Sequence, residues 1–394
     1  MKDACAGRHP LGDGVSAIAN QPCDCGTIRL TLPVTRRSGP VAGCDLREIT
    51  SPGPTRHRLD TISIVVTGQG IKSFLGRWPA AKAAAYVAND AWWALRIRVG
   101  SIDRPGGTHA RVSLEDSVDY IEQVMADYCL YGDLKSCSGR AAEVGPGDNA
   151  GVALLLREAG FDMVDLVERF RIHRDEAQHR QIYELLASRH DIDRLRPSIG
   201  WDDRQLSGIR WVDGSSAEDY FVAEAARGGY YDLIVSRAVL EHLYDPLTAL
   251  CDMAACLRPG GRMLHKIDFR DHGMFTPALP ELTFLRFSPA IYRRMTIHSG
   301  RPNRILLPHY LKLATRLERE KDFRCQILVT SLVGVGEVVP HVPLADVPRG
   351  LLNSAIDTVR SQRVFLARRF ADFTDAELAV SGIFFVGERP AASK

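Results

Sequence analysis

The chain has 394 residues, of which 45% are hydrophobic and 25% are charged, as is usual for globular proteins. Its formal net charge of +2 at pH 7 gives no general attraction to nucleic acids or membrane surfaces. No apolar run has the length of a membrane span, and the first residues lack the apolar core of a secretory signal, so we expect a cytoplasmic protein.

Residues 1–60 are rich in Gly, Pro, Ser and Arg and show little periodicity, which predicts an irregular or disordered segment. A start codon placed too far upstream is the alternative interpretation. Cys23 and Cys25 form a CxC pair, with Cys5 and Cys44 further away. A lone CxC without a regular second pair is poor spacing for zinc, so we predict no metal site.

Residues 61–138 are predicted to form a helical extension. Trp78–Arg98 and Ser113–Gly132 both carry apolar residues at three- and four-residue spacing, which is typical of amphipathic helices. Acidic residues follow Ser113, as at the start of a helix. We expect these helices to precede and cover an α/β domain.

Residues 139–394 are predicted to form that domain, because short apolar runs alternate there with helical segments. The first five strand candidates are Ala141–Gly145, Met163–Glu168, Gly208–Asp213, Tyr231–Val239 and Gly261–Phe269. The helices between them are Asn149–Gly160, Asp175–His190, Ser216–Gly228 and Pro246–Arg258. This alternation indicates right-handed βαβ units and a parallel sheet that is buried on both faces.

Two further apolar runs, Phe323–Leu332 and Val380–Pro390, are expected to complete the sheet. A helix is predicted at Leu307–Glu318, and another at Asp357–Phe370 between the two final runs. Insertions are expected at residues 270–304 and 333–378.

The insertion at residues 270–304 has aromatic and apolar residues and is predicted to be a substrate lid beyond the fifth strand. Its arginines suggest an acidic or phosphorylated substrate, with a plain solvated helix face as the alternative. They are Arg286, Arg293, Arg294, Arg301 and Arg304.

A glycine turn follows the first strand and opens a helix. Gly145 and Gly147 allow a tight turn and a close approach of the backbone to a ligand at the carboxyl end of the sheet. Glu168 ends the second strand, where a carboxylate can accept hydrogen bonds from both ribose hydroxyls of a nucleoside. Asp165 is the alternative acid, but it falls within the strand.

A nicotinamide dinucleotide would use the same architecture, but the usual fingerprint GxGxxG is incomplete. Ala150 stands where the third glycine is expected, and Asp148 at the helix entrance would repel a pyrophosphate. An NAD-dependent oxidoreductase is therefore the alternative and not the first interpretation.

The segment Gly229–Asp268 carries the most specific motifs. Asp232 begins an apolar run, Glu241 and His242 form a Leu-Glu-His turn, and Leu257-Arg-Pro-Gly-Gly261 precedes a strand. In this order and spacing the chain resembles the class I methyltransferases that use S-adenosyl-L-methionine (SAM), in particular their small-molecule type. The resemblance implies an α/β fold with a Rossmann-like seven-stranded sheet, helices on both faces and two final antiparallel strands.

The resemblance also implies a set of cofactor contacts. SAM carries a positive sulfonium and amino group, which suit acidic neighbours. Ser216 replaces the acid that the family often places at the adenine, with Asp213 as the displaced alternative, and Asn149 replaces the family's third glycine. The implied contacts are Glu143, Gly145, Gly147 and Asp148 at the methionine end, Glu168 at the ribose, Ser216 and Ala217 at the adenine, and Ser236 and Arg237 beneath the cofactor.

Methyl transfer to a hydroxyl needs a base, and the polar cluster around the fifth strand supplies candidates. His272 is the first choice and His265 the second, because the ordinary pKa of histidine lies near neutral pH; Asp271 is the third. His242 is expected to pack against a helix or support the cofactor pocket.

The sequence therefore predicts SAM-dependent methyl transfer to a small-molecule or glycan-type acceptor, with oxygen as the nucleophile. A non-catalytic relative that binds SAM is a further alternative. Nucleic acid as acceptor is disfavoured by the charge, and a protein acceptor stays open.

Overall fold

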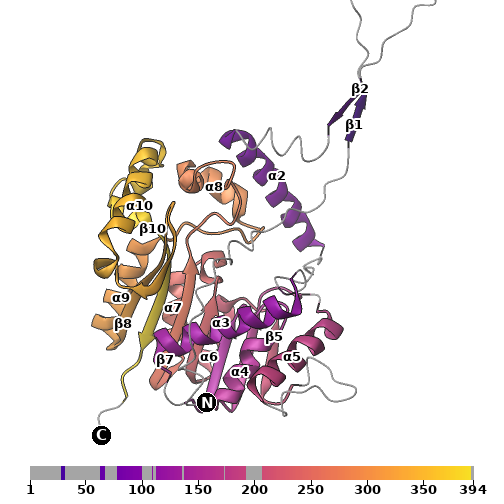
Figure 1. Cartoon of the computed structure of the whole chain (residues 1–394), viewed down its shortest axis with the longest axis vertical. Coiled ribbons are helices and arrows are strands. Elements are labelled where there is room, and N and C mark those ends of the chain that lie inside the picture. Colours follow the sequence, from indigo (N-terminus) through magenta and orange to yellow (C-terminus); the bar gives the residue numbers. More distant parts are fainter. Residues whose placement is uncertain are drawn as a thin grey trace, which may run out of the picture.

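The computed structural model describes residues 28–31, 63–66, 78–99, 109, 112–134, 137–172, 174–191 and 206–391. An eight-stranded sheet forms its centre, in the order β5-β4-β3-β6-β7-β10-β8-β9, and helices cover both faces (Figure 1). The strands are β3 (Arg140–Val144), β4 (Met163–Glu168), β5 (Ile209–Asp213), β6 (Tyr231–Arg237), β7 (Leu257–Asp268), β8 (Arg324–Leu332), β9 (Gly336–Val342) and β10 (Val380–Glu388).

The helices form two layers and an upper group. They are α2 (Pro79–Arg98), α3 (Leu114–Gly132), α4 (Gly151–Ala159), α5 (Glu176–His190), α6 (Ala217–Ala226), α7 (Pro246–Ala255), α8 (Pro289–Thr296), α9 (Leu307–Lys321), α10 (Arg349–Gln362) and α11 (Asp375–Ala379). Helices α3, α4 and α5 share one hydrophobic core with the sheet, and α6, α7 and α9 share another on the opposite face. None of the helices in the described part of the chain has the length and apolar character needed to cross a membrane.

Strands β3 to β7 pair in parallel, as their apolar sequences predict. Their residues are buried toward both cores, which is why these strands read as nearly continuous apolar runs. The chain passes from β3 outward through β4 and β5 and then returns to β6 on the other side of β3. Ligands of such sheets bind at the carboxyl ends of the strands where this order reverses, which here is between β3 and β6.

The C-terminal part of the sheet differs from the prediction in strand direction. β10 lies between β7 and β8 and runs antiparallel to both, so β8 has the same direction as the central strands. The prediction that both final runs are antiparallel to the central strands was therefore wrong for β8. The apolar pattern shows that a strand is buried on both faces, but it does not show which neighbours the last two strands pair with.

The sheet also has an eighth strand where seven were predicted. β9 lies in the expected insertion at residues 333–378 and pairs antiparallel with β8 at the edge of the sheet. Its mostly exposed residues and Pro340 hide it from an apolar-run search, because an edge strand needs only one paired side. The helix predicted at Asp357–Phe370 instead begins at Arg349 and ends at Gln362.

The helix α2 is fixed to the segment that follows β7. It packs against α8, and its buried Asp90 accepts hydrogen bonds from the backbone N–H groups of His298 (2.9 Å) and Ser299 (2.8 Å) and from the His298 ring (2.9 Å). Lys82 and Tyr86 donate to backbone carbonyls of the same segment. The predicted lid therefore has a structured core that α2 supports (Figure 1).

Two short strands precede this body. β1 (Ile28–Thr31) and β2 (Ser63–Val66) pair antiparallel, and β1 is the part of residues 1–60 that the structure describes. A zinc site was considered in the sequence and not predicted. The cysteines in question lie outside the described residues; they are Cys5, Cys23, Cys25 and Cys44. The five cysteines within them are all free.

Candidate functional site

The glycine turn lies at the carboxyl end of β3. Gly145 and Gly147 have φ values of +69° and +75°, which favour glycine. A Cβ added to Gly145 would collide with the Val239 side chain, whereas one added to Gly147 would meet nothing within 4 Å. Gly145 is therefore needed for packing, and Gly147 borders open space.

Glu168 ends the neighbouring strand β4. The backbone N–H of Gly145 donates to the Val167 carbonyl at 2.9 Å, so the glycine turn and the end of β4 lie side by side. The Glu168 carboxylate accepts from the N–H of Phe170 at 3.1 Å, and its carbonyl accepts from Gly214 at 2.8 Å in the turn after β5. The three consecutive strand ends thus form one continuous edge.

Asp165, the alternative to Glu168, is fully buried and occupied by other residues. It accepts hydrogen bonds from the Nε atoms of Arg140 and Arg210, both at 2.8 Å, and from the Tyr231 hydroxyl at 2.7 Å. This network crosses β3, β4, β5 and β6 inside the protein. Its role is structural, which leaves Glu168 as the acid at the edge of the sheet.

The residues predicted near the adenine have structural partners. The Ser216 hydroxyl caps α6, accepting from the N–H of Asp219 at 3.1 Å and donating to its carboxylate at 2.7 Å. Ala217 is buried in the first turn. Asp213 accepts from Arg174 at 2.7 Å, and the Arg174 guanidinium lies 3.5 Å from the centre of the Trp211 ring.

Two acidic residues flank the glycine turn. Glu143 is 8% exposed, one of its oxygens has no hydrogen-bond partner among the described residues, and burial raises its pKa to about 8. Asp148 is 1% exposed and lies close enough to His109 for its charge to act on that ring. Burial lowers the pKa of His109, and the charge of Asp148 offsets part of that effect.

The residues at the end of β6 are turned into the protein. The Ser236 hydroxyl shares a 2.7 Å hydrogen bond with Nδ1 of His265, and both residues are fully buried. Burial lowers the pKa of His265 to about 3, so this imidazole is uncharged at neutral pH and is a weak base. Arg237 donates to Asp127 of α3 at 2.6 Å, and Lys266 donates to the same carboxylate at 3.1 Å.

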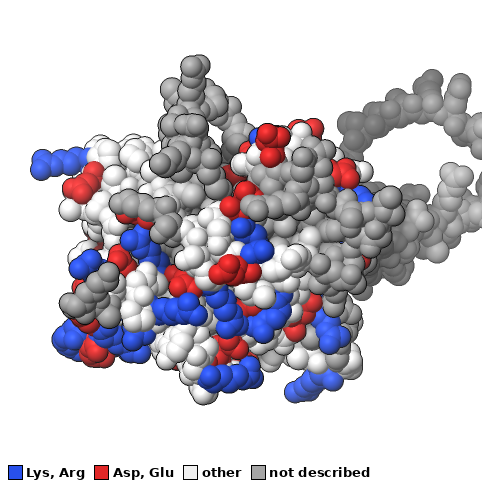
Figure 2. All heavy atoms as spheres, turned by 90° about the horizontal axis from the view of Figure 1, so that it is seen from below, with Lys and Arg blue, Asp and Glu red and all other residues white. Residues whose placement is uncertain are grey.

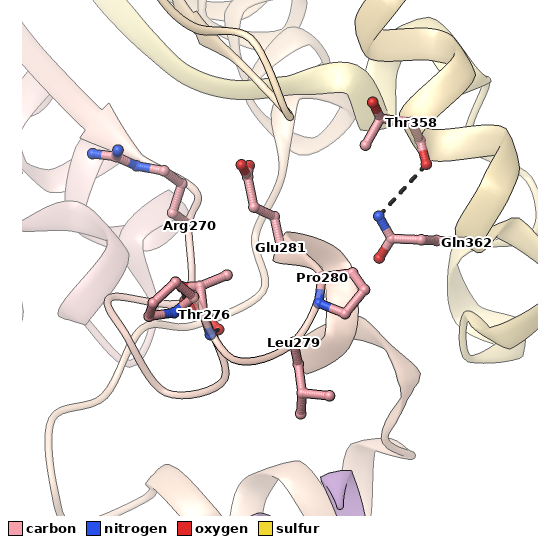
Figure 3. A pocket seen from close by; sticks show the side chains of 9 residues that line it. Arg270, Thr276, Leu279, Pro280, Glu281, Thr358 and Gln362 are labelled. Carbon is pink, nitrogen blue, oxygen red and sulfur yellow. Dashed lines mark hydrogen bonds between the residues drawn. The ribbon is translucent and has the colours of Figure 1, made fainter. Parts of the chain in front are cut away.

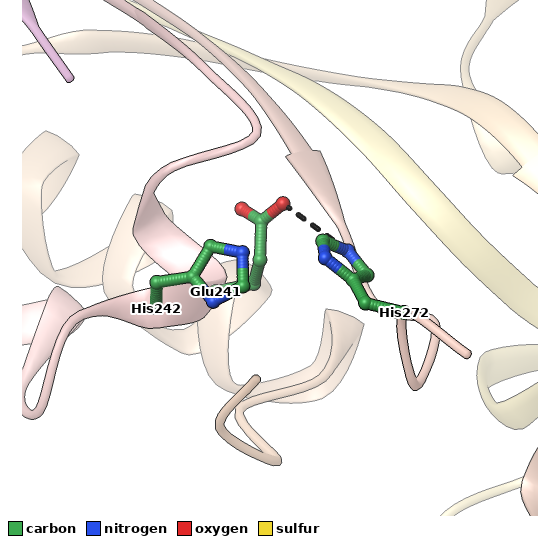
Figure 4. A group of neighbouring side chains, drawn as sticks. All are labelled: Glu241, His242 and His272. Carbon is green, nitrogen blue, oxygen red and sulfur yellow. Dashed lines mark ion pairs between the residues drawn. The ribbon is translucent and has the colours of Figure 1, made fainter. Parts of the chain in front are cut away.

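A second polar group lies where β6 and β7 end, and we call Glu241, His242, Asp268 and His272 the histidine cluster. Nε2 of His272 lies 3.6 Å from a Glu241 oxygen and 3.4 Å from an Asp268 oxygen. The His242 and His272 rings meet edge to face with centroids 4.8 Å apart. Figure 4 shows the Glu241 carboxylate directed at the His272 ring.

Burial and charge shift the pKa values of the histidine cluster in different directions. Burial raises the pKa of Glu241 to about 8. Burial alone would raise the pKa of Asp268, but hydrogen bonds from His272 and Arg270 outweigh it and hold that pKa below its usual range. Burial alone would lower the pKa of His272, but Asp268 and Glu241 together raise it.

Asp271, the third predicted catalytic residue, supports the following turn. Its carboxylate accepts from the N–H groups of Gly273 (3.1 Å), Phe275 (2.7 Å) and Thr276 (3.0 Å) and from the Thr276 hydroxyl (2.6 Å). Four hydrogen bonds fill the oxygens of one carboxylate. We therefore assign Asp271 the structural role of holding this turn.

A hollow of about 430 Å³ lies between the loop after β7 and α10 (Figure 3), and its lining residues Arg270 and Asp271 are chain neighbours of the histidine cluster. Glu281 borders it on one side, and Thr358 and Gln362 of α10 border it on the other. Arg270 also lines the hollow and donates to Asp268 at 2.6 Å, which joins the two sites. The α10 residues carry no sequence signal of such a role, because only the fold brings them to this loop.

The fold is that of a Rossmann-like α/β protein. Its parallel sheet reverses strand order between β3 and β6, and a glycine turn lies at that point. Residues 124–311 match the family model described as a methyltransferase domain, and this range contains every predicted cofactor and catalytic residue. The match, the sheet order and the glycine turn support a SAM-dependent methyltransferase domain of class I in this part of the chain. The family match does not support the alternative of an NAD-dependent oxidoreductase.

No curated protein matches the sequence. Solved structures that it resembles include the plantazolicin methyltransferase BpumL with S-adenosylhomocysteine (SAH), at 11% identity, 70% of this chain, 89% of that chain and a TM-score of 0.33. A second is the N-methyltransferase NodS from Bradyrhizobium japonicum WM9 with SAH, at 18% identity. The likeness covers 40% of this chain and 63% of that chain, with a TM-score of 0.25. A third is phospholethanolamine N-methyltransferase 2 from Haemonchus contortus with phosphomonomethylethanolamine and SAH, at 13% identity. The likeness covers 71% of this chain and 61% of that chain, with a TM-score of 0.32.

Proposed function

We propose that the chain transfers the methyl group of SAM to a hydroxyl oxygen of a small-molecule or glycan-type acceptor in the cytoplasm. One observation carries the proposal: the glycine turn, Glu168 and the histidine cluster all lie at the carboxyl ends of the neighbouring strands β4, β3, β6 and β7. Free cysteines are expected in a reducing compartment.

The cofactor is proposed to lie along this edge. The Glu168 carboxylate accepts hydrogen bonds from the ribose hydroxyls, and the methionine end passes Gly147, where the structure leaves open space. The buried acids Glu143 and Asp148 flank the proposed path of the methionine end, and the positive charge of the cofactor would favour the ionised form of Glu143 there.

The other predicted contacts belong to the same proposal. Ser216 and Ala217 line the adenine through the first turn of α6, and Ser236 forms the floor beneath the sulfonium. Arg237 contributes by fixing the end of β6 to Asp127 and does not itself point at the cofactor.

The acceptor is proposed to lose its proton at the histidine cluster. An oxygen lone pair attacks the methyl carbon, and the C–S bond breaks with its electron pair staying on sulfur, which yields SAH. In the simplest form of the proposal His272, which lies 3.4 Å from Asp268, accepts the hydroxyl proton in its uncharged form, so we expect turnover to rise with pH through the raised pKa of this imidazole. The interior position and low pKa of His265 make it the weaker candidate.

The hollow beside the cluster is the proposed acceptor site. Its polar lining of Glu281, Thr358 and Gln362 offers hydrogen-bond acceptors and donors, which suit a hydroxylated molecule. Two of the lid arginines have other tasks: Arg304 donates to the Phe287 carbonyl at 2.6 Å, and Arg286 lies over the Phe365 ring. The lining therefore favours a neutral acceptor over a phosphorylated one.

Calorimetric titration with SAM and with NAD, followed by measurement of SAH formed from a panel of hydroxylated and amino acceptors, tests the proposal. We expect binding of SAM but not NAD, and turnover with hydroxylated acceptors. Turnover restricted to amino acceptors would contradict the oxygen nucleophile, and the absence of SAM binding would contradict the proposed cofactor site.

A further inference from the structure

The spacing in the histidine cluster fits a bound metal ion. Two ligand atoms that each lie about 2.1 Å from a tetrahedral metal are separated by about 3.4 Å. Nε2 of His272 lies 3.6 Å from the Glu241 oxygen. Glu241, His242 and His272 each offer one ligand atom, and all three atoms lie within 4.8 Å of one another. A small movement of the His242 ring toward the other two ligand atoms would complete the set of three metal ligands.

Glu241 provides a second, independent observation. Its side chain is 1% exposed, and neither carboxylate oxygen has a hydrogen-bond partner among the described residues. A buried carboxylate without hydrogen bonds is costly unless a cation or a proton neutralises it. The carboxylate is directed into the space between the two histidines (Figure 4).

The second nitrogen of His242 is held as in many metal-binding histidines. Nδ1 of this ring lies 2.9 Å from the Gly300 carbonyl, which can only accept, so Nδ1 carries the proton. The other nitrogen, Nε2, is then unprotonated, which is the form that ligates a metal. A backbone carbonyl in this position fixes both the tautomer and the orientation of a metal ligand.

We propose that Glu241, His242 and His272 bind one divalent transition-metal ion, which holds and activates the acceptor hydroxyl. Two imidazoles and one carboxylate form a ligand set that zinc and related ions use in catalytic sites, with the remaining position open to substrate. The inference rests on the proposed function and changes one step of it. The metal-bound hydroxyl releases its proton to water, its oxygen attacks the methyl carbon, and sulfur keeps the electrons of the C–S bond.

Metal binding can be measured without knowing the acceptor. The full-length protein, stripped with a chelator, would be titrated with Zn²⁺ by calorimetry and with Co²⁺ by its visible absorption. We expect one equivalent to bind, with Co²⁺ bands of a tetrahedral or five-coordinate site. Glu241→Gln and His272→Gln should each weaken binding by at least about ten-fold. His190→Gln, a surface histidine paired with Glu122, is the matched control and should bind as the wild type does.

Equal Zn²⁺ affinity in the wild type, Glu241→Gln and His272→Gln, or no binding by the wild type, would overturn the inference. Far-UV circular dichroism identifies variants that fail to fold, and His242→Gln then serves as the second ligand variant. SAM titration of the same stripped protein separates the two proposals. SAM binding without metal binding overturns the metal site alone, whereas loss of SAM binding in the folded wild type overturns the proposed function.

Discussion

At the scale of single residues, the structure assigns different tasks to groups of the same type. Gly145 is required because Val239 packs where its side chain would be, whereas Gly147 borders open space. His265 is buried beside Ser236 and is neutral, whereas His272 lies among carboxylates that favour its charged form. The sequence placed both glycines in the turn after β3 and both histidines within or after β7, but only packing shows how their surroundings differ.

The open space at Gly147 leads to a direct test. Gly147→Val should abolish SAM binding while the protein still unfolds cooperatively, because the new side chain enters the proposed cofactor space. The backbone cost of a non-glycine residue at φ +75° is about 1–2 kcal/mol. Gly228→Val is a matched control, since Gly228 has φ +69°, also has open space around it and follows α6. Calorimetric SAM titration of both variants checks the prediction, which unchanged affinity in Gly147→Val would refute.

Glu143 predicts a pH dependence of stability. Its folded pKa of about 8 lies above the ordinary 4.5, so the folded state holds this proton more tightly than the unfolded state. The stabilisation of the folded state by this proton is therefore fully present below pH 4.5 and is lost as the pH rises toward 8. Glu143→Gln should remove this loss, so the variant should gain stability relative to the wild type between pH 5 and about pH 8.

Melting temperatures of the two proteins across this pH range, without SAM, measure the effect. Exposed Glu184→Gln is the control and should follow the wild type at every pH. Parallel curves for Glu143→Gln and the wild type would mean that the Glu143 carboxyl is not held in its neutral form.

His272 can be tested for turnover as well as for metal binding. His272→Ala should keep its SAM affinity, because the ring lies after β7 and away from the glycine turn, and should lose turnover by about 10²- to 10⁴-fold. Steady-state measurement of SAH formation checks this once an acceptor is found. Wild-type turnover in the variant would exclude His272 from the reaction.

At the scale of elements, the parts with strong periodicity were predictable and the parts held by tertiary contacts were not. The strands β3 to β7 and their helices follow the predicted segments closely, since burial on both faces requires continuous apolar runs. The edge strand β9 and the start of α10 lack such runs. The lid segment contains a short 3-10 helix, Glu281–Arg286, and α8, which packs against α2.

The contact between α2 and the lid segment rests largely on Asp90. Asp90→Ala would remove three hydrogen bonds and leave the N–H groups of His298 and Ser299 without their acceptor. We expect a loss of about 1–3 kcal/mol of local stability. Hydrogen exchange should increase in α2 and α8 but not in the sheet, and Asn89→Ala, on the exposed side of the same helix, should leave it unchanged. Equal protection in Asp90→Ala and wild type would contradict this assignment.

At the scale of the whole molecule, one sheet separates two hydrophobic cores and carries the proposed site along one edge. The surface seen in Figure 2 mixes basic and acidic side chains without a continuous patch of one sign, in line with the small net charge. The overall class of fold could be predicted because strand and helix alternate regularly. The position of the proposed acceptor hollow could not, because it joins residues about 80 positions apart in the sequence.

Because both cores share the sheet, we expect them to respond to the cofactor together. SAM at 100 times its dissociation constant should stabilise the folded state by about 2.7 kcal/mol. Differential scanning calorimetry should show the α/β body melting in one transition that moves to higher temperature with SAM. A shift confined to one of two separate transitions would show that the cores unfold independently.

The position of β10 has a consequence for synthesis in the cell. The strand next to β7 is made last, since β8 and β9 precede β10 along the chain but reach β7 only through it. While a ribosome is still translating residues before 380, the nascent domain exposes the unpaired edge of β7. Chaperone protection of the nascent chain would therefore matter most just before translation reaches that strand.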